Sequence, residues 1–204
     1  MPTIYRFPIL YRLAMRVGYG PDYGPRYALV ADLVADHIGQ PGSVLELCCG
    51  DLGLYHRLAS RGLAGSYLGL EQAPAMLRRA RRCGVDVRAF DVRAGGALPR
   101  AGAVIMQASL YQFHDIADAL LPRLWEAARR LLLIAEPVRN VSQSRFAAAR
   151  WIARILTRTD DRVHTFRYTE TTLLDLYRRC GIPVSRLDRT PSGREVIVCS
   201  VRAP

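Results

Sequence analysis

The stretch Val44-Leu45-Glu46-Leu47-Cys48-Cys49-Gly50-Asp51-Leu52-Gly53 joins a short apolar run to a turn of small residues, and an amphipathic segment follows it. This order predicts a strand, a tight loop and the start of a helix. A second apolar run, Tyr67-Leu68-Gly69-Leu70-Glu71, lies about twenty residues further on and ends in a carboxylate. The pair has the layout of the first half of a nucleoside-binding α/β sheet. A carboxylate at the tip of the second strand can accept both hydroxyls of a ribose, so Glu71 is the predicted ribose ligand.

The loop chemistry separates two nucleoside cofactors. A dinucleotide site uses G-x-G-x-x-G so that backbone N–H groups and a helix N-terminus meet a pyrophosphate. The matching positions here are Cys48, Gly50 and Gly53, so the first glycine is missing. Glu46 and Asp51 also place negative charge beside the loop, which would repel phosphates. The same charge suits a sulfonium and an α-amino group, and the predicted cofactor is therefore S-adenosylmethionine.

Five segments in order resemble the class I S-adenosylmethionine-dependent methyltransferases. The resemblance is strong over residues 40–137 and moderate over 165–202. It rests on Glu46-Leu47-Cys48-Cys49-Gly50-Asp51, Gly69-Leu70-Glu71-Gln72-Ala73-Pro74-Ala75-Met76-Leu77, Val87-Arg88-Ala89-Phe90-Asp91, Ala103-Val104-Ile105-Met106-Gln107-Ala108 and Leu131-Leu132-Leu133-Ile134-Ala135-Glu136-Pro137.

This resemblance implies a set of cofactor residues. It places Met76 near the adenine, gives Asp91 the adenine amino group, and puts Gln107 beside the methionine part of the cofactor. The reaction it implies leaves S-adenosylhomocysteine as product. The full set of implied cofactor-binding residues is Glu46, Cys48, Gly50, Glu71, Gln72, Met76, Asp91, Val92 and Gln107.

One position departs from the family pattern. The third glycine of the first motif falls on Leu52, and Gly53 comes one residue late. Either the loop is a residue longer or the helix begins differently. A non-catalytic protein that kept the fold is therefore the rival hypothesis, and a NAD-dependent oxidoreductase is a distant third.

The predicted fold class is α/β, a three-layer Rossmann-like sandwich with a seven-stranded, mostly parallel sheet, an antiparallel last strand, a helical N-terminal cap and a helical lid insertion. We expect one methyltransferase domain over 1–204. Its parts are a cap over 1–40, a cofactor-binding core over 41–137, a lid over 138–165, and a closing helix and hairpin over 166–204.

Local signals place several elements within these parts. Thr169 is the expected N-cap of a helix that ends at Cys180, and residues 185–190 and 194–202 form the predicted hairpin. The glycines and prolines of Gly18–Pro25 predict an irregular loop between a helix around 9–17 and another over 27–38. Apolar spacing predicts the lid helix over 142–158.

Composition narrows the function further. The chain carries 29 basic and 18 acidic residues, a net charge of +11, and contains no lysine. A ribose 2′-O-methyltransferase of this class needs a catalytic lysine, so that activity is excluded. The slot after the fourth strand reads Gln107-Ala108-Ser109-Leu110 and lacks the motifs of the base-modifying enzymes. An RNA substrate is thus a less favoured alternative, although a basic surface could meet phosphates.

Other classes find little support in the sequence. The five cysteines have no metal-ligand spacing, so no metal is predicted, and their odd number argues against a disulfide framework. No apolar run is long enough to span a bilayer, and we expect a cytoplasmic protein. No oligomeric state is predicted.

Methyl transfer from a sulfonium is a direct displacement that depends mainly on alignment, which can contribute about 7–11 kcal/mol. A base is needed only where the acceptor is protonated, and His114, just after the fourth strand, is the candidate catalytic residue. The expected acceptor is an oxygen, nitrogen or carbon atom of a small-molecule metabolite. The candidate substrate-binding residues are Tyr11, Tyr19, Tyr23, Tyr111, Glu136 and His164.

Overall fold

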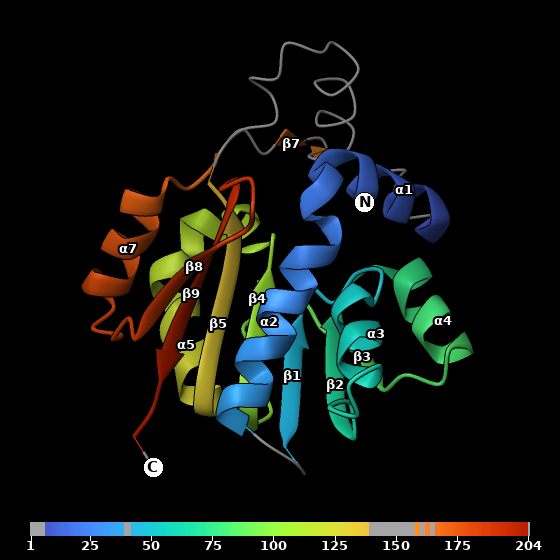
Figure 1. Ribbon diagram of the computed structural model, residues 1–204, viewed down its shortest axis with the longest axis horizontal. Coiled ribbons are helices and arrows are strands. Elements are labelled where there is room, and N and C mark those ends of the chain that lie inside the picture. The colour runs from blue at the N-terminus through green and yellow to red at the C-terminus, as the bar shows by residue number, and fades with distance from the viewer. Residues whose placement is uncertain (1–6, 39–41, 139–157, 160–161, 164–165, 204) are drawn as a thin grey trace.

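The computed structural model describes residues 7–38, 42–138, 158–159, 162–163 and 166–203. A seven-stranded sheet forms the centre of the molecule, in the order β3-β2-β1-β4-β5-β9-β8 (Figure 1). Neighbouring strands from β3 to β5 run parallel, and β9 is antiparallel to both β5 and β8. The strands are β1 Ser43–Leu47, β2 Ser66–Glu71, β3 Val87–Ala89, β4 Ala101–Gln107, β5 Ala128–Pro137, β8 Arg186–Arg189 and β9 Glu195–Val201. The predicted sheet, with its antiparallel last strand and closing hairpin, is confirmed.

Helices cover both faces of this sheet and make three layers (Figure 1). Side chains alternate between the faces, as the pleat of a strand requires. In β4, Val104 and Met106 pack with α5 and α7, whereas Ala103 and Ile105 pack with α2 and α3. The helices are α1 Pro8–Tyr19, α2 Tyr23–Ile38, α3 Gly53–Ala59, α4 Pro74–Arg82, α5 Ala117–Ala127 and α7 Glu170–Arg179, with 3₁₀ turns η2 Gly20–Asp22 and η3 Leu110–Ile116.

The N-terminal segment corrects one prediction. Gly18–Pro25 is not an irregular loop, because α1 continues to Tyr19, η2 follows, and α2 begins at Tyr23. Its prolines lie in the first turns of η2 and α2, where a missing N–H costs no helical hydrogen bond. Gly20 supplies the positive φ of +54° that turns the chain between the helices. In the described part of the predicted cap, α1 lies at the carboxyl ends of the strands, and α2 runs from there across one face of the sheet (Figure 1).

The C-terminal part follows its sequence signals. The hydroxyl of Thr169 accepts from the backbone N–H of Thr172, and the Thr172 hydroxyl accepts from the N–H of Thr169, which makes a reciprocal cap on α7.

The predicted lid helix over 142–158 lies almost wholly outside the described residues. The strands β6 Arg158–Thr159 and β7 Arg162–Val163 are described and pair antiparallel. In the described part of the chain, no helix has the length and apolar character needed to cross a membrane.

Candidate functional site

The loop after β1 turns through three left-handed residues at alternate positions. Cys48, Gly50 and Leu52 have φ of +56°, +51° and +65°. These are the three positions at which the first motif of the methyltransferase family has its spaced glycines. Leu52 is the N-cap of α3 and is completely buried, so it supplies the backbone turn that glycine usually provides. Each non-glycine residue held there costs about 1–2 kcal/mol, and packing of Leu52 in the core offsets that cost.

The glycine one position later has a packing role. A Cβ on Gly53 would lie 2.3 Å from Cζ of Tyr27, so only glycine lets this tyrosine lie against the loop. The Tyr27 hydroxyl lies 3.5 Å from Oδ1 of Asp51, and the Tyr23 hydroxyl donates to Oδ2 at 2.9 Å. Arg12 of α1 is 3.6 Å from the same carboxylate. Asp51, expected to present free negative charge at the loop, is therefore buried among partners from α1 and α2.

Glu71 joins the tip of β2 to this loop. Its Oε2 accepts from the Gly50 N–H at 2.9 Å, and Oε1 accepts from the N–H groups of Gln72 and Ala73 at 2.8 Å. Burial raises the pKa of this carboxyl, and the three N–H donors lower it again in part. A carboxylate offers about four lone-pair sites, so Glu71 retains capacity for hydroxyl donors.

Glu46 and Gln107 meet across the neighbouring strands β1 and β4. The Gln107 amide donates to Oε1 of Glu46 at 3.2 Å, and the Tyr67 hydroxyl donates to Oε2 at 2.6 Å. Burial raises the pKa of Glu46 to about 8 despite these two donors. The carbonyl oxygen Oε1 of Gln107 is buried and has no hydrogen-bond partner in the described part of the molecule. Such an atom is costly to bury unless a donor reaches it.

The tip of β5 holds another buried acid. Glu136 is completely buried, and its Oε1 accepts from the backbone N–H groups of Ser109 and Leu110 at 2.8 and 2.6 Å. Its Oε2 makes no hydrogen bond among the described residues. Burial raises the pKa of Glu136 to about 8. Cys48 lies in the loop after β1. Burial raises the pKa of its thiol, and the charge of Glu71 raises it further. This argues against a nucleophilic thiolate at Cys48.

Two predicted substrate residues, Tyr19 and Tyr111, lie within electrostatic reach of Glu136. Burial raises the pKa of Tyr19, Arg26 lowers it in part, and Tyr111 and Glu136 are among the groups that raise it further. The Tyr19 ring lies 4.1 Å from the guanidinium of Arg26, and the Tyr111 ring lies 3.9 Å from that of Arg167. Tyr11 approaches from α1, because a Cβ on Gly50 would lie 3.4 Å from its hydroxyl.

The remaining predicted residues include exposed side chains, buried side chains and one residue outside the described region. His114 is exposed in η3, stacks on Phe166 with ring centroids 4.3 Å apart, and places Nδ1 3.2 Å from the carbonyl of Tyr111. Asp91 is exposed after β3 and accepts from the N–H of Arg93. Val92 and Met76 are buried, and Gln72 is exposed. His164 lies outside the described residues.

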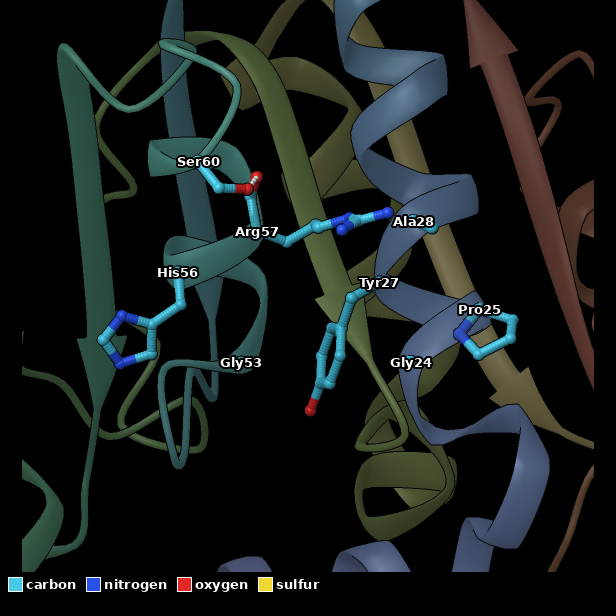
Figure 2. Close-up of a pocket in the computed structure, with 8 residues that line it drawn as sticks. All are labelled: Gly24, Pro25, Tyr27, Ala28, Gly53, His56, Arg57 and Ser60. Atoms are coloured by element: carbon cyan, nitrogen blue, oxygen red, sulfur yellow. Dashed lines mark hydrogen bonds between the residues drawn. The ribbon is translucent and has the colours of Figure 1, made fainter.

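A groove of about 480 Å³ lies between α2 and α3. Figure 2 shows Arg57 reaching from α3 toward α2 near Ala28, with Tyr27 on the α2 side. None of the predicted cofactor residues lines it. The lining residues are Gly24, Pro25, Tyr27, Ala28, Gly53, His56, Arg57 and Ser60.

Sequence reasoning missed the Asp51 cluster and the buried ion pair behind Tyr19. In that pair Arg26 donates to both carboxylate oxygens of Glu195 at 2.8 and 2.7 Å. The partners are far apart in the chain, and no local pattern joins them. Arg26 precedes the helix predicted over 27–38, so nothing local marked its burial.

Solved structures share this architecture at low sequence identity. Magnesium protoporphyrin IX methyltransferase ChlM from Synechocystis PCC 6803, with bound SAH, superposes with a TM-score of 0.67 at 18% identity over 95% of this chain and 87% of that one. The mitomycin 7-O-methyltransferase MmcR gives 0.66 at 17% identity over 97% of this chain and 58% of that one. Streptomyces venezuelae DesVI gives 0.61 at 17% identity over 95% and 97% of the two chains.

The chain has the Rossmann-like methyltransferase fold. No protein-family model matches it, and no curated protein matches its sequence. The fold places the tips of β1, β2, β4 and β5, which carry Glu46, Glu71, Gln107 and Glu136, along one edge of the sheet.

Proposed function

We propose that this protein is an S-adenosylmethionine-dependent methyltransferase that acts on a small-molecule acceptor. The observation that carries the proposal is the pair formed by the Glu46 carboxyl and the Gln107 Oε1, which has no hydrogen-bond partner among the described residues. Two acceptor groups at one buried point suit an ammonium group, which brings three donors and a positive charge. The α-amino group of the cofactor has that chemistry.

The other residues of the edge fit the same cofactor. Glu71, at the next strand tip, would accept the ribose hydroxyls, and Gly50 leaves the loop without a side chain at its closest approach to Tyr11. Bound there, the cofactor would supply an electrophilic methyl group on a sulfonium. Solved structures with this fold contain SAH or SAM, which supports the assignment.

The acceptor would lie between the loop and the tip of β5. Glu136 offers a partnerless carboxyl oxygen, and a pKa of about 8 suits a group that accepts a proton near neutral pH. Tyr19 and Tyr111 would supply aromatic walls, and Tyr11 and Tyr23 the α1 side of the pocket. His114 is the alternative base. An O–H or N–H acceptor fits this edge best, and mitomycin and oxaline, named with neighbours of the fold, are small molecules of the expected size class.

Calorimetric titration of the full chain with S-adenosylhomocysteine, with NAD as control ligand, tests the cofactor. We expect micromolar binding of the first ligand and none of NAD. Glu71→Ala and Gln107→Leu should each weaken binding at least about tenfold, whereas Glu126→Ala, an exposed glutamate on α5, should not.

If S-adenosylhomocysteine does not bind at millimolar concentration, the proposal is wrong and the protein is a non-catalytic member of the fold. If it binds, a screen of small acceptors with labelled methyl donor follows. Glu136→Gln should then lower kcat more than it changes cofactor affinity. If His114 is the base instead, His114→Ala should lower kcat and Glu136→Gln should not.

A further inference from the structure

The large exposed apolar side chains are concentrated on one helix. Among the described residues, five of the six exposed large hydrophobic side chains belong to α1 or its N-cap. Ile9 exposes 78% of its surface, and the other four expose slightly more than half. The five are Phe7, Ile9, Leu10, Leu13 and Val17, and the sixth is Val184. A contiguous apolar surface of this kind marks an interaction site.

Helix α1 faces solvent with its apolar side, whereas an ordinary surface helix buries that side. Ile9, Leu13 and Val17 are spaced by four residues and form one exposed stripe. The opposite side holds the helix to the protein, where Tyr11 lies at Gly50 and Arg12 pairs with Asp51. The polar and aromatic side therefore faces inward and the apolar stripe faces solvent.

The charges beside the stripe have one sign. Arg16 is the exposed charged residue of α1, because Arg12 pairs with Asp51 on the inward side. The neighbouring helix α4, which contacts α1, carries four arginines and no acid. Figure 1 shows α1 at an outer edge of the molecule, close to α4. An apolar stripe beside these arginines, on a chain of net charge +11, is complementary to a surface that is apolar inside and negative outside.

We propose that α1 docks the protein on an anionic lipid bilayer, with Ile9, Leu13 and Val17 inserted at the headgroup boundary. A second copy of the chain would bring its own arginines against those of α1 and α4, and such like charges disfavour that occupant. A convex helical ridge is also the shape that lies in a lipid interface. The inference does not depend on the proposed function.

Co-sedimentation of the full chain with vesicles tests it. We expect binding to equimolar phosphatidylglycerol and phosphatidylcholine, with weak binding to phosphatidylcholine alone and to either in high salt. Leu13→Glu should weaken binding at least about tenfold, since burial of one leucine alone contributes that much. Val184→Glu, the matched exposed residue away from α1, should bind as the unmodified protein does.

Charge is tested in the same way. Arg78→Glu on α4 should weaken binding to the anionic vesicles, and Arg129→Glu, an exposed arginine at the start of β5, should not. Circular dichroism melts of every variant establish that it folds. Equal binding to neutral and anionic vesicles, or unchanged binding by Leu13→Glu, would overturn the proposal. So would a dimer in sedimentation velocity that Leu13→Glu dissociates, because a second copy would then cover the stripe.

Discussion

At the scale of single residues, the loop after β1 depends on backbone conformations that the side chains do not favour. Cys48 and Leu52 keep left-handed φ values without being glycine. The chain thus retains the loop shape of the fold although its sequence departs from the spaced-glycine pattern. Leu52 packs in the core and Cys48 at its edge, whereas a side chain at Gly50 would meet Tyr11 of α1.

Gly50→Ala should therefore affect both stability and ligand binding. The left-handed φ costs about 1–2 kcal/mol for alanine, and the new Cβ would come into van der Waals contact with the Tyr11 hydroxyl at 3.4 Å. Gly181→Ala is the matched control, because Gly181 has φ +65° and open space around it. Urea denaturation should show a similar loss in both variants, whereas calorimetry should show weaker S-adenosylhomocysteine binding only for Gly50→Ala. Equal affinities would mean that the loop tolerates a side chain beside Tyr11.

A second residue-scale prediction concerns Glu46. Its pKa of about 8 keeps much of the carboxyl protonated at neutral pH, and an ammonium beside it would favour the carboxylate. Binding of S-adenosylhomocysteine should release a proton, and affinity should rise between about pH 6 and pH 8 as Glu46 ionises. Calorimetry in buffers of different ionisation enthalpy measures the proton count. Glu46→Gln should abolish both effects, and a pH-independent affinity of the unmodified protein would contradict the assignment of Glu46 to the ammonium.

At the scale of elements, the sequence predicts what local patterns determine. The apolar runs of β1, β4 and β5 are buried on both faces, so their composition alone marks them as central parallel strands. The glycines and prolines of 18–25 led to the wrong prediction of an irregular loop, because these residues also suit the first turns of helices. The partners of Asp51 could not be predicted, since Tyr23 and Tyr27 reach it from a helix that precedes β1. The burial of Glu136 under the η3 turn likewise needs the folded chain.

The cap of α7 is an element whose signal is local, and its energetic contribution is testable. Thr169→Ala removes the side-chain acceptor for the N–H of Thr172 and should cost about 1 kcal/mol of unfolding free energy. Thr171→Ala, one residue from the cap partner and exposed, is the control and should stay within about 0.5 kcal/mol. Urea denaturation measures both. Equal losses in the two variants would show that the cap hydrogen bond adds nothing to stability.

At the scale of the whole molecule, the two ends of the chain are joined by buried polar contacts. Arg26 of α2 is paired with Glu195 of β9, and Asp22 accepts from the hydroxyls of Thr190 and Ser192 in the β8–β9 turn. These contacts fix the N-terminal helices on the sheet beside the candidate site. Removing one partner of such a buried pair typically costs about 3–5 kcal/mol, because the other charge is left uncompensated.

Burial of Glu46 and Glu136 should make the stability of the whole protein fall as pH rises. Both carboxyls have a pKa of about 8 in the folded chain, whereas an unfolded glutamate ionises near pH 4.3. The folded chain therefore holds protons that the unfolded chain has released, and stability is lost as pH rises through the folded pKa. His56 acts in the opposite direction at lower pH, because burial lowers its pKa.

The window in which the two acids dominate is thus about pH 7 to pH 8, above the usual pKa of histidine and below that of a free thiol. Urea denaturation of the ligand-free protein should lose up to about 1.4 kcal/mol per pH unit for each carboxyl. Glu136→Gln should flatten the dependence by about half, since Glu46 remains, and Glu126→Gln, an exposed glutamate, should leave it unchanged. If stability is constant across this window, the two carboxyls are already ionised in the folded chain. Glu136 would then face the acceptor as a fixed negative charge instead of a group poised to take up a proton.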